Sequence, residues 1–167
     1  MSDLLNNITL REAELSDSDL IFRWRNDPWI IAKGSLNKTV EKEEHENWFS
    51  NFIQNPHSHM YIININDEPA GQVRFMGKKD QKYAEISIYL MDNYVGQGNG
   101  VKALKQACQN AFDDLHIETI IAFILKENEQ SRRAFEKAGF IPLEQYNMID
   151  SQSIETKAER LTYCYSG

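Results

Sequence analysis

The sequence predicts an α/β fold with a mixed, mostly antiparallel sheet at its centre. Three strand-like runs follow one another between residues 60 and 90, close enough for an antiparallel meander. A strong helix pattern over 100–115 then leads into the apolar run TIIAFIL, residues 119–125, which is typical of a strand covered on both faces. Because a helical crossover makes its two flanking strands parallel, the sheet is predicted to be mixed.

Length and composition agree with one folded domain over residues 1–167. Of the 167 residues, 41% are hydrophobic and 26% are charged, as in a globular protein. Cys108 and Cys164 lie far apart in the sequence, and Cys108 falls on the apolar stripe of a predicted helix. We therefore expect buried thiols, with no disulfide and no thiolate metal site.

The net charge restricts the partners of the chain. A formal charge of -7 argues against a general nucleic-acid binder, which needs a basic face to displace counterions from phosphates. The first residues, MSDLLNNITL, lack a basic region followed by an apolar run, and no stretch approaches the roughly 20 apolar residues of a membrane span. The resulting expectation is a cytoplasmic location with no membrane partner.

The first third of the chain predicts one strand and two helices. The strand is expected over 8–13, and the first helix over 16–27, ending at Pro28 because proline lacks the backbone donor. The second helix is expected to begin near Thr39 as its N-cap and to end before Pro56.

The rest of the chain predicts a meander, two helices and three more strands. In the last meander strand, apolar side chains alternate with polar ones, so one face carries the functional groups Glu85, Ser87 and Tyr89. The helix over 100–115 has apolar residues at spacings of three and four. The remaining predicted elements are strand 119–125, helix 128–140 with Gly139 at its end, and strands 140–146 and 160–166.

A glycine-rich loop precedes the helix over 100–115. Gly96, Gly98 and Gly100 stand where a helix N-terminus offers unpaired N–H groups and partial positive charge, which predicts a cradle for a phosphate or pyrophosphate. A tight strand-to-helix turn is the alternative. A P-loop would need Gly-Lys-Ser/Thr after the glycines, where this sequence has Gly100, Val101, Lys102 and Ala103. A dinucleotide-binding fold would need GxGxxG and further strand and helix units, so neither class is favoured.

Two motifs resemble those of the GCN5-related N-acetyltransferase (GNAT) superfamily. The family's cofactor motif, Gln/Arg-x-x-Gly-x-Gly/Ala, matches residues 95–100, and its later motif matches Asn128 followed by Glu-Lys-Ala-Gly-Phe at 136–140. The resemblance implies a GNAT fold with about seven strands and about four helices, in which strands 4 and 5 splay apart. It also implies an N-acetyltransferase that uses acetyl-CoA (CoA).

In this family, backbone N–H groups of the loop bind the cofactor pyrophosphate. That role is carried over to Gly96, Gln97, Gly98, Asn99, Gly100 and Val101. Val95 departs from the motif, which has Gln or Arg there, so one side-chain contact to phosphate is expected to be missing. Candidates to replace it are Lys102, Lys105, Arg132 and Arg133, although ordinary solvated charge remains an alternative for each.

The resemblance also assigns residues around the thioester. Backbone near Leu90 would hold the thioester carbonyl and stabilise the oxyanion, while the pantetheine arm fills the gap between strands. Asn128 would bind that arm and Ser131 would lie close to the cofactor, with helix capping as the alternative. Phe135 occupies the usual position of a Tyr general acid. Glu85 is the candidate base, acting through water, with a strand-surface carboxylate as the alternative.

By the same resemblance, the first half of the chain shapes the acceptor site. Its density of Arg, Trp, His and Asn looks like that of acetyltransferases acting on nucleotide-linked amino sugars of bacterial surface glycans, in pseudaminic-acid-type pathways. Arginine could grip a diphosphate, and tryptophan could stack on a base or sugar. The candidates are Arg25, Asn26, Trp29, His45, Trp48 and Arg74. Core packing for Trp48 and a surface position for His45 are alternatives.

Other functions stay open at this point. A protein N-terminal or polyamine acetyltransferase fits the segment FRWRND, which also occurs in relatives of the ribosomal-protein acetylases. A catalytically silent acyl-CoA sensor fits the departures at Val95 and Phe135. The histidines show no metal-ligand spacing, so no metal is expected. The expected partner is a small-molecule amine, and a homodimer is left open.

Overall fold

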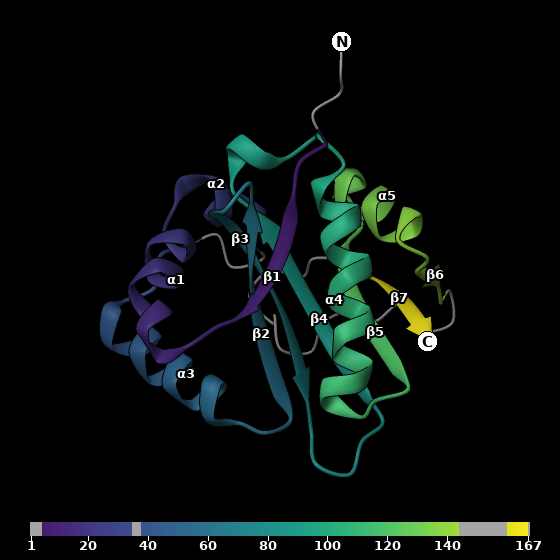
Figure 1. Cartoon of the computed structure of the whole chain (residues 1–167), viewed down its shortest axis with the longest axis horizontal. Coiled ribbons are helices and arrows are strands. Elements are labelled where there is room, and N and C mark those ends of the chain that lie inside the picture. The colour runs from purple at the N-terminus through teal and green to yellow at the C-terminus, as the bar shows by residue number, and fades with distance from the viewer. Residues whose placement is uncertain (1–4, 35–37, 144–159, 167) are drawn as a thin grey trace.

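The computed structural model describes residues 5–34, 38–143 and 160–166. In this part of the chain, the strands form one seven-stranded sheet in the order β1-β2-β3-β4-β5-β7-β6 (Figure 1). The strands are β1 (Ile8–Glu12), β2 (Ser58–Ile65), β3 (Glu68–Gly77), β4 (Tyr83–Leu90), β5 (Thr119–Leu125), β6 (Ile141–Pro142) and β7 (Arg160–Ser166). The helices are α1 (Ser18–Arg25), α2 (Pro28–Lys33), α3 (Lys42–Gln54), α4 (Asn99–Leu115) and α5 (Glu129–Lys137).

The sheet is mixed, as predicted. Strands β1 to β4 pair antiparallel, β4 and β5 pair parallel, and β7 pairs antiparallel with both β5 and β6. The parallel pairing is short, because it covers only Tyr83–Glu85 on β4 and Thr119–Ile121 on β5. Beyond these pairs the two strands separate, which is the splay that the resemblance implied.

Two layers of helix bury opposite faces of the sheet. Along β2 the side chains alternate, so that Tyr61 and Ile63 pack in the core under α4 whereas Met60 and Ile62 pack against α1 and α3. Figure 1 shows α4 lying across the sheet, with α1 and α3 grouped beyond its β2 side. The position of α4 brings its N-terminus to the end of β4 where the splay opens.

The first helix ends before Pro28, as predicted, but one further helix and one later helix start differ from the prediction. Pro28 also begins helix α2, because proline is tolerated in the first turn of a helix, where its missing N–H is not needed. The Asp27 side chain caps this helix by accepting a hydrogen bond from the Trp29 amide at 2.8 Å. Helix α3 begins at Lys42 with Glu41 as its N-cap, not at Thr39.

The later start of α3 has a local cause. The Asn26 amide group donates to the Val40 carbonyl at 3.1 Å and accepts from the Val40 N–H at 2.7 Å. Both main-chain groups of Val40 are therefore bonded to the Asn26 side chain, and helix α3 begins after this residue.

The C-terminal elements are observed in part. Strand β7 matches the predicted range, while β6 covers only two residues of the predicted strand 140–146. Residues 144–146 of that prediction lie outside the described residues. Among the described residues, no helix is long and apolar enough to cross a membrane.

Candidate active site

A cavity of about 860 Å³ opens where β4 and β5 separate. Its walls are the end of β4, the glycine loop with the first turn of α4, one side of α5 along its length, α2 with the segment that follows it, and single residues of α1 and β3. The cavity therefore lies at the junction of elements that the sequence places far apart, and it contains most of the predicted cofactor contacts.

The glycine loop is open to this cavity. Gly96 and Gly98 have φ of 79° and 76°, in the left-handed region, and Gly98 is the N-cap of α4. A Cβ at either position would meet no atom within 4 Å, so the glycines are needed for backbone conformation and not for close packing. Because both line the cavity together with Gly100, the free N–H groups of the α4 N-terminus lie beside an open space.

The side chains of the loop are turned away from that space. The amide of Asn6 donates to Gln97 Oε1 at 3.0 Å and to Asn99 Oδ1 at 3.1 Å, and Asn99 Nδ2 donates to the Tyr94 carbonyl at 2.9 Å. Gln97 and Asn99 therefore brace the loop against the N-terminal segment. Any anion held here would be bound by main-chain N–H groups, as predicted for these positions.

The end of β4 presents main-chain groups to the splay. The Met91 N–H donates to the Ala70 carbonyl at 2.8 Å, which fixes the alternation of the β3–β4 ladder. Under that alternation, the N–H groups of Ile88 and Leu90 face the side of β5, which has already diverged. On the other side of β4, Gly71 permits the close approach of β3, since a Cβ at Gly71 would lie 2.2 Å from the Tyr89 carbonyl oxygen.

Trp29 connects α2 to this strand. Its indole Nε1–H donates to the Leu90 carbonyl at 3.1 Å, and Lys33 Nζ lies 4.1 Å from the Trp29 ring centroid. Trp29 itself is not among the cavity-lining residues, while Ile30 and Ile31 of the same helix are. In this structure Trp29 positions α2 next to the end of β4, and its predicted stacking on a base or sugar stays a prediction.

A pair of arginines, one from α1 and one from β3, lines one part of the cavity. Arg25 and Arg74 both line it, and their Cζ atoms lie 4.4 Å and 5.2 Å from the centroid of the half-buried Trp48 ring. Burial lowers the pKa of both guanidinium groups, which nevertheless stay charged at neutral pH. Trp48 packs against the core under α1 and α3, so it supports the arginines through cation–π contacts.

His45 is a buried partner of Arg25, not a surface residue. Arg25 Nη1 lies 3.1 Å from His45 Nδ1, and His45 Nε2 lies 2.9 Å from the Ser18 carbonyl. Because arginine can only donate, Nδ1 accepts and Nε2–H donates to Ser18, which defines the neutral tautomer. Burial lowers the pKa of His45, consistent with that state. His45 therefore holds the Arg25 guanidinium in place.

Buried polar atoms without partners lie at the same end. Among the described residues, Arg74 Nε, the Tyr89 hydroxyl and both amide atoms of Gln72 are buried and form no hydrogen bond. Arg74 and Tyr89 line the cavity, beside Ser87. Because unsatisfied buried polar groups are rare, these atoms mark a place where a ligand would complete the hydrogen bonding. The alternation along β4 predicted that Ser87 and Tyr89 share a polar face, but it did not predict that the Tyr89 hydroxyl is buried without a hydrogen bond to any described residue.

Glu85 lies at the point where the splay begins. It is half-buried on the same strand face as Ser87 and Tyr89, and it is paired with Ile121 in the last parallel pair. It does not line the cavity, although its charge acts on the Arg74 guanidinium. Its predicted role as a base acting through water stays a prediction.

On α5, capping and cavity lining coincide. Asn128 Oδ1 accepts from the Ser131 N–H at 3.1 Å as the N-cap of α5, and both residues line the cavity. Phe135, at the position where a Tyr acid is usual, is buried with its ring packed edge-on against Phe140.

Of the four basic residues considered as replacements at Val95, only Arg133 lines the cavity. Arg132 lies 4.0 Å from Glu129, and Lys102 and Lys105 are exposed on α4. One of the four is therefore placed to contribute charge to the cavity.

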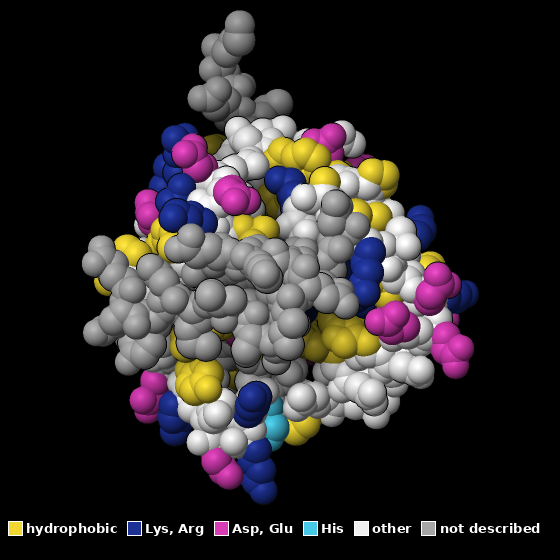
Figure 2. All heavy atoms as spheres, turned by 180° about the vertical axis from the view of Figure 1, so that it is seen from behind, with side chains coloured by type: hydrophobic (Ala, Val, Ile, Leu, Met, Phe, Trp, Pro, Cys, Tyr) yellow, Lys and Arg dark blue, Asp and Glu magenta, His cyan; other side chains and the backbone are white. Residues whose placement is uncertain are grey.

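The cavity is basic in an acidic protein. Among the described residues that line it, the basic ones are Arg25, Lys33, Lys38, Arg74, Arg133 and Lys137, and the single acidic one is Glu129. The chain as a whole carries a formal charge of -7. Figure 2 shows that Lys and Arg are interspersed with Asp and Glu around the part of this face that is drawn in colour, whereas the described lining of the cavity is mostly basic.

A family model described as the acetyltransferase (GNAT) domain matches residues 7–141. The chain therefore belongs to the GNAT acetyltransferase family, which confirms the resemblance seen in its motifs. It is an acetyl-CoA-dependent N-acetyltransferase. The cavity brings together the N–H groups at the N-terminus of α4 and the two diverging strands β4 and β5, where the predicted cofactor contacts lie.

Three known proteins illustrate the range of the similarity. Acetyltransferase PseH of Campylobacter jejuni subsp. jejuni serotype O:2 is 25% identical over 130 residues, covering 77% of this chain and 80% of PseH. AAC(6')-Ib in complex with ribostamycin and coenzyme A has a TM-score of 0.80 and 18% identity, covering 96% of this chain and 93% of that one. Spermidine N-acetyltransferase from Vibrio cholerae, with CoA and spermine, has a TM-score of 0.81 and 18% identity, covering 95% of both chains. At this identity, the two structures share the fold.

Proposed function

We propose that the protein transfers an acetyl group directly from acetyl-CoA to the primary amine of a nucleotide-linked amino sugar. The observation that carries this proposal is the basic lining of the cavity, above all the pair Arg25 and Arg74 at the acceptor side. A nucleotide-linked sugar brings a diphosphate that two guanidinium groups can bind through parallel hydrogen bonds. The similarity to PseH supports the same substrate class.

A polyamine acceptor fits this arrangement less well. Spermidine is a polycation, and two positive charges at the acceptor side would repel it in a desolvated site. Arg74 Nε, which has no hydrogen-bond partner among the described residues, can only donate and therefore requires an acceptor, which phosphate oxygens supply and ammonium groups do not. The charge and the unsatisfied donors therefore favour an anionic substrate.

When bound, acetyl-CoA supplies an activated acyl group. The N–H of Leu90, which faces the gap between β4 and β5, would be the donor for an oxygen that gains negative charge during acyl transfer. Glu85 removes a proton from the acceptor ammonium through water, because only the neutral amine attacks. Phe135 offers no proton to the departing thiolate, so solvent protonates it; a thiol with a pKa of about 8.5 is a tolerable leaving group.

The experiment is a comparison of acceptors. Release of the CoA thiol would be measured with UDP-linked amino sugars, spermidine and peptides with free N-termini, each with acetyl-CoA. We expect turnover with at least one UDP-amino sugar and none with spermidine. A reaction with the peptide or spermidine and none with any sugar would overturn the substrate class. Binding of acetyl-CoA without thiol release for any amine would indicate a sensor.

A further inference from the structure

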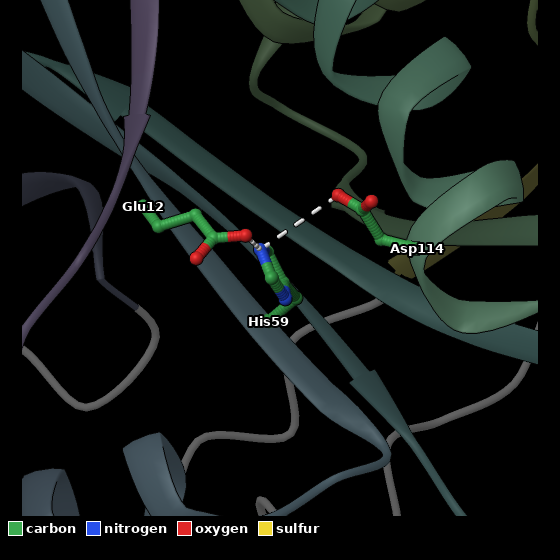
Figure 3. A group of neighbouring side chains, drawn as sticks. All are labelled: Glu12, His59 and Asp114. Atoms are coloured by element: carbon green, nitrogen blue, oxygen red, sulfur yellow. Dashed lines mark ion pairs between the residues drawn. The ribbon is translucent and has the colours of Figure 1, made fainter.

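Glu12, His59 and Asp114 form a polar cluster that is separate from the cavity. They come from β1, β2 and the last turn of α4, and Figure 3 shows the His59 ring between the two carboxylates. His59 Nε2 lies 3.2 Å from Glu12 Oε1 and 3.8 Å from Asp114 Oδ2. None of the three lines the cavity, and Asp114 lies at the end of α4 remote from the glycine loop.

The ring nitrogen at the centre of this cluster is unsatisfied. His59 Nε2 is buried and has no hydrogen-bond partner among the described residues. Glu12 is near enough to accept a hydrogen bond but does not lie in the direction of a ring N–H, and Asp114 is too far away. Because buried polar atoms are normally paired, a nitrogen held between two carboxylates without a hydrogen bond calls for a different partner.

The spacing of the three donor atoms suits a small cation. In a tetrahedral zinc site with bonds of about 2.0–2.1 Å, neighbouring ligand atoms lie about 3.3–3.4 Å apart. The separation of His59 Nε2 and Glu12 Oε1 is already 3.2 Å, and one ligand atom from each residue lies within 4.8 Å of the others. The remaining separations between ligand atoms are longer than in a zinc site. Small side-chain rotations can shorten them, since the Glu12 and Asp114 side chains are 68% and 41% exposed.

The surroundings hold the ligands in position. The buried Tyr61 hydroxyl donates to Asp114 Oδ2, and the Tyr61 ring packs against His59 with centroids 4.6 Å apart. A hydrogen bond to a ligating carboxylate from outside the coordination shell is a usual feature of metal sites, because it orients the ligand.

We propose that Glu12, His59 and Asp114 form a binding site for a divalent transition cation of the zinc class. The ligands would be one imidazole nitrogen and two carboxylate oxygens, with water at the fourth position. Mg²⁺ and Ca²⁺ prefer shells made only of oxygen, so the histidine selects against them. The bound cation would fasten β1 and β2 to the C-terminal end of α4 and stabilise the fold.

The test is metal binding by the whole chain after treatment with a chelator. Equilibrium dialysis against ZnCl₂ should show saturable binding of one zinc per chain. At a hundredfold excess over the Kd, the Tm should rise by about 5–10 °C. Glu12→Gln and His59→Gln should each weaken zinc binding at least tenfold and reduce this shift. Glu12 is mostly exposed, so its variant is expected to fold, which circular dichroism would verify.

Asp113→Asn is the matched control, because it removes an exposed carboxylate next to Asp114 that is not part of the cluster. It should leave zinc binding unchanged. Absence of saturable binding would overturn the proposal. Zinc binding that survives in both Glu12→Gln and His59→Gln would overturn it as well, as would tighter binding of MgCl₂ or CaCl₂ than of ZnCl₂.

Discussion

Trp29 donates its indole N–H to the main-chain carbonyl of Leu90 at 3.1 Å, so a helix from the first third of the chain is attached to the end of the strand beside the splay. This bond occupies the Leu90 carbonyl while the N–H of the same residue faces the gap. The position of α2 over the cavity and the orientation of the β4 end are therefore coupled through one side chain.

Replacement of Trp29 by Phe should test this coupling. The variant keeps most of the ring but loses the donor, which should lower the free energy of unfolding by about 0.5–1.5 kcal/mol. Because α2 would then be less firmly placed, kcat should fall several-fold. Urea denaturation and steady-state thiol release would measure the two effects. A variant as active and stable as the wild type would show that the bond does not position α2.

Replacement of Gly98 by Ala should weaken binding of acetyl-CoA. A residue with a Cβ pays about 1–2 kcal/mol for the left-handed conformation that Gly98 adopts, so the loop is expected to shift. The expected result is an increase of about tenfold in KM for acetyl-CoA. Gly100→Ala provides the comparison, since Gly100 has no positive φ and its Cβ would make an ordinary contact at 3.9 Å with Leu90. Equal effects of both substitutions would argue against a conformational role.

Replacement of Arg74 by Met should act on the acceptor. If Arg74 binds a phosphate oxygen, kcat/KM for a UDP-amino sugar should fall by about 10–100-fold while KM for acetyl-CoA changes little. Arg74→Lys should be intermediate, because lysine keeps the charge but loses the planar fork. Gain of activity on spermidine by the Met variant would support the repulsion argument. An unchanged kcat/KM would place the diphosphate elsewhere.

His45 gives an expectation for the effect of pH on stability. Its pKa is lowered in the folded protein, chiefly by burial, so the unfolded chain binds a proton more readily than the folded one. Stability should therefore be unaffected by this group well above pH 6.5 and should decrease as the pH falls below about 6.5. His45→Gln should remove that part of the decrease. Urea denaturation of both proteins at pH 7.5 and pH 5.5 would measure it, and parallel losses in both would contradict the expectation.

Much of the fold could be predicted because its signals are local. The alternation along residues 83–90 predicted a polar strand face, and Ser87 and Tyr89 of that face line the cavity. The glycines before α4 correctly indicated an open helix N-terminus. Pro28 correctly predicted the end of the first helix, but the second role of the same residue, as the first residue of α2, was missed because proline is compatible with both positions.

The arrangement of side chains could not be predicted, because it depends on contacts between distant segments. His45 is an ordinary helix position in the sequence, and only the approach of α1 reveals that it supports Arg25. The cluster of Glu12, His59 and Asp114 draws on three elements separated by long stretches of chain, so no spacing pattern exists to signal it.

The short parallel pairing of β4 and β5 has a consequence for self-association. A strand that loses its partner becomes an edge, and free edges are templates for the addition of other chains and for aggregation. Here the two edges face each other and converge at Glu85 and Ile121, so they form the sides of a wedge and not the rim of the sheet. A single extended molecule can enter such a wedge, whereas the flat edge of a second sheet cannot. The unpaired edges of β4 and β5 therefore face each other within the sheet, and its outer edges are formed by β1 and β6.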